Sequence, residues 1–292
     1  MKVLITGSNG QLGRELSAAL EAYPRIEVVA VDIDTLDITD QKAVETFLRA
    51  GCFTHVVNCA AYTAVDRAEE YKAECSAVNT TGIENLARLS DELDYRIIHI
   101  STDYVFDGTS CRPYSESDKP NPLNVYGSTK RRGETALLGL APGSVIVRTG
   151  WLYSPHGHNF VKTILGRGKQ GKRLEVVSDQ IGTPTYAADL AEAIVTILNT
   201  PSWTPGIFNY ANEGVASWYD FAVAILEAAG LNEQADAIVP VPSNDYPTPA
   251  TRPAFTVLSK NKIKAAFGVR VPHWQSSLRR CIDRLKDYEP AN

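Results

Sequence analysis

The chain has 292 residues, a formal charge of −5 and hydrophobic residues at 44% of its positions, which predicts one large or two modest domains with an ordinary buried core. Its mildly acidic balance, without blocks of lysine or arginine, gives no electrostatic footprint for nucleic acid. No apolar run approaches the roughly 18 residues that span a bilayer, and no basic-then-apolar leader precedes the first strand-like segment. We therefore expect a cytoplasmic protein with no membrane partner.

Five cysteines are spread along the chain without any C-x-x-C or C-x-x-H pairing. An odd number in this pattern predicts neither a disulfide framework nor a zinc site, and it favours a reducing compartment. We expect all five to be buried small side chains and no metal to be bound by them.

Short β-branched runs alternate with helix-length segments in the first half of the chain. The predicted strands are Val3–Thr6, Ile26–Val31, His55–Asn58, Arg96–Ile100 and Val145–Arg148. The predicted helices between them are Gln11–Ala22, Gln41–Arg49, Ala77–Leu93 and Tyr126–Leu138. This alternation is typical of a parallel sheet covered by helices on both faces. The predicted fold class is α/β, a Rossmann-like doubly wound parallel sheet.

Glycine and proline become frequent after residue 150, and the helical pattern is interrupted. The helix Ala188–Leu198 and the strand Gly206–Tyr210 could still belong to the sheet. The stretch Pro240–Pro253 is too rich in proline for regular structure, and a loop of that length is usually functional. We predict a nucleotide-binding domain over residues 1–150, with a helix and strand returning to it at about 186–211. A smaller, irregular α/β substrate-binding domain would take up 151–185 and 212–292.

A glycine-rich loop joins the first predicted strand to the first predicted helix. Gly7, Gly10 and Gly13 form a G-x-x-G-x-x-G pattern there, which permits a tight turn and close approach of a pyrophosphate to the helix N-terminus. Asp32 ends the second strand 19 residues after Gly13, where an acid can bind an adenosine ribose. The combination predicts a dinucleotide site. A carboxylate at this place repels a 2′-phosphate, so the residues favour NADH over NADPH without excluding the latter.

Tyr126 and Lys130 are four residues apart at the start of a predicted helix, so their side chains share one face. A tyrosine hydroxyl with a pKa of about 10 needs a stabilised phenolate to act near neutral pH, and a lysine ammonium one turn away provides it. Thr102 follows the strand Arg96–Ile100 at the carboxyl end, where open α/β sheets place their sites. Its hydroxyl can orient a substrate carbonyl. The three residues form a candidate ketone-reducing set.

With these motifs in place, the sequence resembles the dTDP-4-dehydrorhamnose reductases of the extended short-chain dehydrogenase/reductase superfamily. The matching segments run in family order from Gly7 to Pro253. They are G-S-N-G-Q-L-G (Gly7–Gly13), N-C-A-A-Y-T-A-V-D (Asn58–Asp66), S-T-D-Y-V-F-D-G (Ser101–Gly108), N-V-Y-G-S-T-K (Asn124–Lys130), R-T-G-W-L-Y (Arg148–Tyr153), N-F-V-K-T (Asn159–Thr163), D-Q-I-G-T-P-T (Asp179–Thr185) and P-T-P-A-T-R-P (Pro247–Pro253).

The resemblance implies an oxidoreductase that passes a hydride from NADPH or NADH to the C4 ketone of dTDP-4-dehydro-L-rhamnose, giving dTDP-L-rhamnose for cell-envelope polysaccharide. Its partner would be this small dTDP-sugar, and the protein a monomer or homodimer. The implied cofactor contacts are Gly10, Gln11 and Leu12 at the pyrophosphate, Asp32 at the ribose, Asp37 and Ile38 at the adenine, and Ala61, Tyr62 and Thr63 at the nicotinamide. The implied substrate contacts are Thr102 and Asp103, Trp151 packed against the sugar, and Asn159, Lys162 and Arg252 toward the dTDP part.

Some members of the resembled family bind Mg²⁺ through glutamates at a dimer interface. Glu15 matches one such position, but the place of the other holds Ala188, with Asp189 offset by one. This departure puts a magnesium site in doubt and leaves Glu15 as an ordinary acid of the first helix.

Two other interpretations of the function of this chain remain open. A nucleotide-sugar 4,6-dehydratase of the superfamily would carry Thr-Asp-Glu where this chain has Thr102, Asp103 and Tyr104, and a 4-epimerase would retain its nicotinamide tightly. A catalytically silent NADP-binding regulatory subunit, like the β subunit of methionine adenosyltransferase, would have no chemical need for the complete set of Thr102, Tyr126 and Lys130.

Overall fold

A six-stranded parallel sheet forms the centre of the computed structural model, which describes residues 1–288. The strand order is β10-β5-β4-β3-β1-β2, and every neighbouring pair is parallel. Its strands are β1 (Lys2–Thr6), β2 (Glu27–Val31), β3 (His55–Asn58), β4 (Arg96–Thr102), β5 (Val145–Thr149) and β10 (Gly206–Asn209). The order in which successive strands are added to the sheet reverses between β1 and β3: β2 lies on one side of β1, and β3, β4 and β5 follow on the other. At such a switch point a crevice opens beyond the carboxyl ends of the strands.

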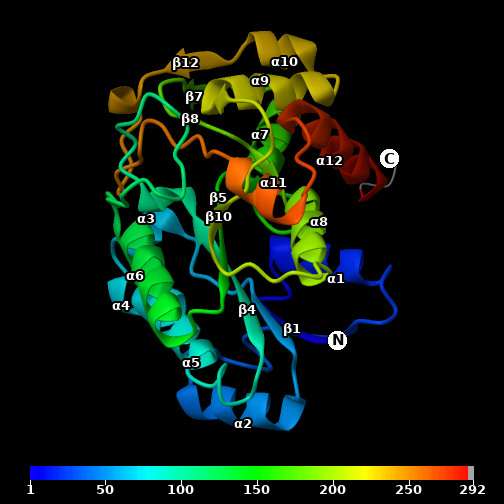
Figure 1. Cartoon of the computed structure of the whole chain (residues 1–292). Helices are drawn as coiled ribbons and strands as arrows, with labels where there is room; N and C mark the ends of the chain where they lie inside the picture. The colour runs from blue at the N-terminus through cyan, green and yellow to red at the C-terminus, as the bar shows by residue number, and fades with distance from the viewer. Residues whose placement is uncertain (289–292) are drawn as a thin grey trace.

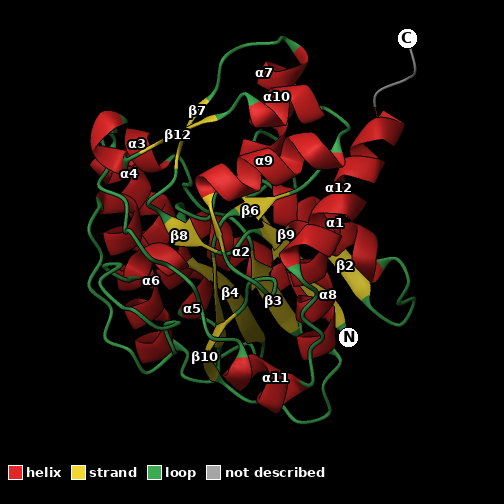
Figure 2. Cartoon of the chain, turned by 90° about the horizontal axis from the view of Figure 1, so that it is seen from above, coloured by secondary structure: helices red, strands yellow, loops and turns green. Residues whose placement is uncertain are grey.

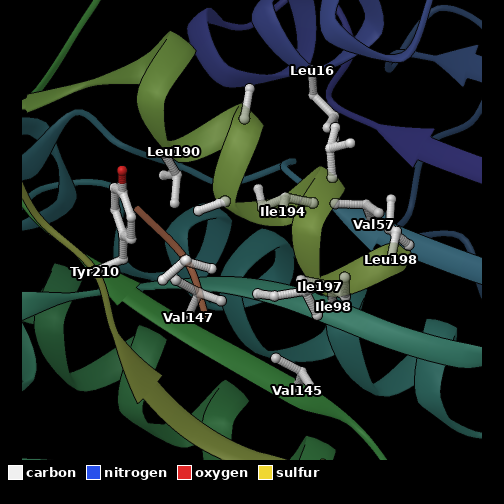
Figure 3. Packing of buried hydrophobic residues seen from close by; sticks show 14 of the residues in the cluster. Leu16, Val57, Ile98, Val145, Val147, Leu190, Ile194, Ile197, Leu198 and Tyr210 are labelled. Carbon is white, nitrogen blue, oxygen red and sulfur yellow. The ribbon is translucent and has the colours of Figure 1, made fainter. Parts of the chain in front are cut away.

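Helices cover both faces of the sheet, which confirms the predicted fold class (Figure 2). On one face lie α1 (Gln11–Leu20), α8 (Ala187–Leu198) and α11 (Asn261–Phe267). The other face carries α2 (Gln41–Gly51), α5 (Gly82–Ala87) and α6 (Val125–Leu140), with the short α3 (Val65–Ala68) and α4 (Lys72–Ser76) beside them. Figure 3 shows the core of the first face, where Leu190, Ile194 and Ile197 of α8 meet Val57 and Ile98 of the sheet.

The remaining elements gather at one end of the molecule, opposite α2 (Figure 1). They are α7 (Phe160–Lys169), α9 (Trp218–Ala228), α10 (Asn232–Asp236) and α12 (Trp274–Tyr288), with the short strands β6 (Leu152–Tyr153), β7 (Glu175–Val177), β8 (Ile181–Gly182), β9 (Thr185–Tyr186), β11 (Ala216–Ser217) and β12 (Val239–Val241). They enclose a core of their own around Phe221, Ile225 and Trp274. None of the described helices has the length and apolar character needed to cross a membrane. The domain boundaries stay a prediction, although α8 does pack against the sheet and β10 does pair with β5 within it.

Three local expectations were wrong. The predicted helix Ala77–Leu93 instead starts with α4, passes through a π-helical turn over Ala77–Thr81, and ends with α5 at Ala87. The proline-rich stretch is not wholly irregular, because β12 contains Pro240 and pairs with β7; both strands of a two-stranded sheet are edges, where a missing N–H is tolerated. The cysteines are not all buried.

Cys52 and Cys111 are exposed, Cys59 is half-buried, and Cys75 and Cys281 are buried. Cys52 follows the C-terminus of α2 in the left-handed region, at φ 49°, a capping position at the surface rather than in the core. All five are free cysteines in the structure.

Candidate active site

A cavity of about 530 Å³ lies beyond the carboxyl ends of β1, β4 and β5. It brings together residues that the sequence assigned to cofactor, chemistry and substrate. Those on its wall are Gly7, Gly10, Gln11, Leu12, Gly13, Ala61, Thr63, Thr102, Asp103, Tyr126, Lys130, Trp151 and Asn159. The predicted residues outside its wall are Asp32, Asp37, Ile38, Tyr62, Lys162 and Arg252.

The glycine-rich loop fits a pyrophosphate. Gly7 has φ 68°, and a Cβ there would lie 2.6 Å from the backbone nitrogen of Ala60. A Cβ on Gly13 would lie 2.3 Å from the carbonyl oxygen of Gly7, so only glycine permits this close packing of helix on strand. No side chain caps the N-terminus of α1. Its first N–H groups therefore remain as donors for an anion beside the cavity.

Asp32 braces this loop. Its Oδ2 accepts a hydrogen bond from the backbone N–H of Asn9 at 2.7 Å, and its Oδ1 accepts one from Ile33 at 2.8 Å. The carboxylate thus stands directly beside the loop, but at the half-buried end of β2 rather than on the cavity wall. Its position suits a ribose at the outer end of a bound dinucleotide.

The predicted adenine and nicotinamide contacts divide between the cavity and the core. Asp37 accepts hydrogen bonds from the N–H and hydroxyl of Thr39, and the Ile38 side chain is buried beneath α5, where a Cβ on Gly82 would touch it. Tyr62 does not line the cavity, and its backbone N–H and carbonyl are both bonded to the side-chain amide of Asn79. Asn79 lies in the π-helical turn, a kind of irregularity often found at functional sites.

Thr102, Tyr126 and Lys130 line the cavity next to the glycine-rich loop. Thr102 ends β4, and its hydroxyl bonds Asp103 at 3.1 Å. Tyr126 is the second residue of α6, which starts at Val125 after Asn124, whose side chain caps the helix. Burial raises the pKa of Tyr126 to about 12, against a lowering influence of Thr102. Burial also lowers the pKa of Lys130 to about 8, which brings its proton transfer close to neutral pH.

Asp103 is also enclosed. Burial raises its pKa to about 6, and a Cβ on Gly150 would lie 2.3 Å from its Oδ2. Tyr104, whose ring meets that of Tyr126 edge-on at 5.9 Å between centroids, completes this part of the wall.

Two indoles close the far side of the cavity. Trp151 has φ 51°, unusual for a bulky residue, and its ring stacks on Trp218 with centroids 3.5 Å apart and planes within 4°. Sequence reasoning missed Trp218. Ser217 and Asp220 form a capping box that could have marked the start of α9 at Trp218, but nothing in the sequence showed that this first residue meets Trp151.

The three residues expected at the dTDP portion have other partners within the chain. The Asn159 amide donates to Gln11 Oε1 at 2.8 Å and caps α7, linking α7 to the start of α1. Lys162 is exposed, and its Nζ bonds the carbonyl of Pro155 at 3.2 Å. Arg252 pairs with Asp66 at 2.7 Å, which fixes the late T-R-P loop against the N-C-A-A-Y-T-A-V-D segment. Their roles toward a substrate stay a prediction.

The candidate metal ligands are engaged by two arginines of α12. Glu15 is only 4% exposed, so it is not an ordinary surface acid, and both its oxygens accept from Arg284 Nη1, at 2.9 and 3.0 Å. Asp189 pairs with Arg280 and accepts from Asn212 at 2.7 Å. Among the described residues no cluster of three or more metal-ligating side chains exists. Because each of the two carboxylates is already neutralised by an arginine of its own chain, the residues present do not fit a magnesium ion here.

We expect added Mg²⁺ and added EDTA each to leave the melting temperature unchanged, because guanidinium groups already neutralise both carboxylates. Arg284→Ala should lower the free energy of unfolding by about 1–2 kcal/mol, since it leaves the buried Glu15 short of a partner while Arg284 itself is partly exposed. Thermal unfolding measures both effects. Lys286→Ala on the same helix removes only a surface pair with Asp283 and should change stability by less than about 0.5 kcal/mol. A magnesium-dependent rise in melting temperature would contradict this account.

The sheet topology, the glycine-rich loop at its switch point and the tyrosine–lysine helix beside it define a short-chain dehydrogenase/reductase with an NAD(P) site. Within that class, the family model for the RmlD substrate binding domain matches residues 1–287, and the chain belongs to that family.

Among its relatives, the dTDP-4-dehydrorhamnose reductase of Aggregatibacter actinomycetemcomitans is 41% identical over 285 residues, covering 95% of this chain and 97% of its own. The solved structure of a dTDP-4-dehydrorhamnose reductase from Clostridium acetobutylicum superposes with a TM-score of 0.93 at 41% identity, covering 98% of this chain and 100% of its own. That of the Bacillus anthracis dTDP-4-dehydrorhamnose reductase, in complex with NADP, has a TM-score of 0.89 at 35% identity, covering 97% and 99%.

Proposed function

We propose that this chain reduces the C4 ketone of dTDP-4-dehydro-L-rhamnose with NADPH or NADH, giving dTDP-L-rhamnose. The observation that carries the proposal is the shared cavity. Thr102, Tyr126 and Lys130 lie on the same wall as the uncapped N-terminus of α1 and its glycine-rich loop. The family membership and the names of the relatives support the sugar nucleotide as substrate.

A bound reduced nicotinamide supplies the hydride in this reaction. The chain's own residues position the ketone and deliver the proton. The Thr102 hydroxyl donates a hydrogen bond to the ketone oxygen, and the Tyr126 hydroxyl transfers its proton to the same oxygen as negative charge develops there. Lys130, one helical turn from Tyr126, then returns a proton to the phenolate. Trp151 and Trp218 provide an apolar wall against the sugar and limit the entry of water.

The test is loss of reduced-nicotinamide absorbance with purified protein and either NADH or NADPH. The ketosugar is generated in place from dTDP-glucose by the upstream dehydratase and epimerase. Oxidation that depends on the complete mixture supports the proposal, and the two cofactors compared show whether Asp32 sets a preference. Oxidation of the nicotinamide in the absence of the epimerase would indicate that the substrate is a neighbouring 4-keto-6-deoxyhexose. No oxidation with cofactor bound would favour a silent binding subunit.

The dehydratase alternative has less support from the site. Tyr104 occupies the place of the second carboxylate, and burial raises the pKa of its hydroxyl above the ordinary value. A neutral phenol there cannot replace a carboxylate base. We further propose that the enzyme works in the cytoplasm, in keeping with its five free cysteines, as a monomer or homodimer.

Lys130→Met should weaken both cofactor affinity and turnover, because one ammonium serves both. The same change should raise stability at pH 7 by about 1–3 kcal/mol, since burial lowers the pKa of Lys130 to about 8 and the charged form therefore costs free energy in the folded state. Above pH 8 the native lysine loses its proton while the unfolded one keeps it, so native stability rises with pH and the advantage of the variant shrinks. Denaturant unfolding at pH 7 and pH 10 measures this; an advantage that grows with pH would contradict it.

A further inference from the structure

Three polar side chains lie abreast on neighbouring strands beneath Lys130. Thr6 of β1 is the register partner of Asn58 in β3, and Asn58 is the register partner of His99 in β4. Each of the three, like Lys130, is only 1% exposed. Groups so far from water must satisfy their hydrogen bonds among themselves, which makes the direction of each bond informative.

The orientation of the Asn58 amide is fixed by a backbone group. The N–H of Ala60 can only donate, and it lies 3.1 Å from Asn58 Oδ1. The hydroxyl of Thr6 donates to the same oxygen at 2.7 Å. Asn58 Nδ2 therefore faces His99 Nδ1, at 3.0 Å. Because an amide nitrogen only donates, Nδ1 of His99 must accept and carries no proton.

His99 is then left with its single proton on Nε2. Burial holds the pKa of this imidazole well below its ordinary value, so the ring is neutral. Nε2 lies 3.3 Å from Lys130 Nζ, which itself donates to the carbonyl of Ile100 at 2.6 Å. An N–H aimed at Nζ is a partner for the lone pair of a neutral amine, whereas an ammonium has no lone pair to receive it.

We propose that His99 is a positioning residue that acts through Lys130: fixed by Asn58 with its proton on Nε2, it donates to Nζ of that lysine whenever Lys130 has given up its proton and is a neutral amine. The inference rests on the proposed ketone reduction for its consequence. After Tyr126 has given its proton to the ketone oxygen, an N–H bond of Lys130 breaks as the O–H bond of Tyr126 re-forms. The amine left behind is the form that His99 stabilises, so His99 favours return of the proton.

Of the other titratable groups that face Lys130, Glu134 on α6 favours its charged form and opposes the burial that lowers the pKa of Lys130 to about 8. Cys59 after β3 and Cys75 on α4 would do the same only as thiolates. Burial keeps both thiols protonated by raising their pKa. Glu134 is paired with Arg148 and Arg131. His99 presents Nε2 to Lys130 Nζ at 3.3 Å, where Glu134 acts on the same lysine through a negative charge.

Nitrogen NMR of the histidine side chains tests the tautomer without any turnover. The chain has five histidines, and the signal that disappears in His99→Gln identifies the ring. In the cofactor-free protein at pH 7 we expect a protonated Nε2 and an unprotonated Nδ1. The opposite tautomer, or a doubly protonated ring, would overturn the proposal.

Two variants test the action on Lys130. In His99→Gln the amide nitrogen takes the place of Nε2 and still donates, whereas His99→Leu removes the donor at similar size. Reduction consumes a proton, so the alkaline limb of kcat/KM reports loss of the proton from Lys130. We expect this limb to move up by about 0.5 to 1 pH unit in the leucine variant and to stay near that of the wild type in the glutamine variant.

If both variants lost rate equally and the alkaline limb of kcat/KM stayed at the wild-type pH in each, His99 would only fill space. That result would overturn the proposal. Titration of the Lys130 side-chain carbon resonance in the same variants gives the comparison without turnover. A wild type that reduces no ketosugar but shows the expected tautomer and Lys130 shift would therefore count against the proposed function, not against this inference.

Discussion

Tyr126→Phe is expected to reduce ketone reduction by about 10²- to 10⁴-fold, because the change removes the proton donor and leaves the rest of the cavity in place. The ring still packs edge-on against Tyr104, and the glycine-rich loop is untouched. Affinity for NADH and NADPH should therefore stay within about twofold of the wild type. Such a change is small, since a tenfold change in affinity corresponds to about 1.4 kcal/mol. Steady-state turnover and fluorescence titration with reduced nicotinamide measure the two quantities separately.

Tyr153→Phe is the matched control. It removes the same hydroxyl from a tyrosine that is 1% exposed, and that hydroxyl has no hydrogen-bond partner in the described part of the chain. Tyr153 does not line the cavity. Turnover of this control should match the wild type, while near-normal reduction by Tyr126→Phe would remove Tyr126 from the mechanism.

Arg148→Met should lower the free energy of unfolding by about 3–5 kcal/mol at pH 7, the largest effect on stability that we expect from one substitution. Arg148 of β5 binds both oxygens of Glu134 at 2.7 Å, and the two side chains are 1% and 0% exposed. The variant leaves the Glu134 carboxylate buried with Arg131 and Ser101 as its remaining partners. Chemical denaturation measures the loss.

The pH dependence of this loss has a defined sign. Burial by itself would raise the pKa of Glu134, but Arg148, with Ser101 and Arg131, holds it below the ordinary value. In the wild type this stability is present above the ordinary pKa of a glutamate and is lost as the pH falls below it. Without Arg148, Glu134 takes up a proton more readily, so the deficit of the variant should narrow toward pH 5. The double variant Glu134→Gln with Arg148→Met should lose less than the two single losses added together. A deficit below about 1 kcal/mol that does not vary with pH would contradict the account.

Features whose signal is local were readable from the sequence. Apolar spacing of three to four residues and short β-branched runs identified α1, α2, α6, α8 and the strands of the sheet to within a few residues. The glycine-rich loop was predictable because its conformation depends on the glycines themselves. Thr102, Tyr126 and Lys130 could be placed together because a strand end and a helix start fix which way each side chain points.

Local signals failed where a distant segment sets the outcome. The helix expected at Ala77–Leu93 contains a π-helical turn, and Asn79 of this turn bonds the backbone of the distant Tyr62. Pro240 joins a strand because β7, far back in the chain, supplies the partner. The sequence likewise held no sign that the short polar residues of β1, β3 and β4 form one row, because strand register is a property of the sheet.

The sequence by itself therefore determined the class of fold and was enough to predict the dinucleotide loop and the candidate ketone-reducing set, since each is encoded within one or two adjacent elements. Only the tertiary structure decided how the charged and aromatic groups are used. It pairs Glu15 with Arg284 and Asp189 with Arg280, stacks Trp151 on Trp218, and aims His99 at Lys130. These contacts join residues far apart in the chain. They form because each buried polar or charged group needs a hydrogen-bond or ion-pair partner, and the fold determines which groups lie close enough to serve.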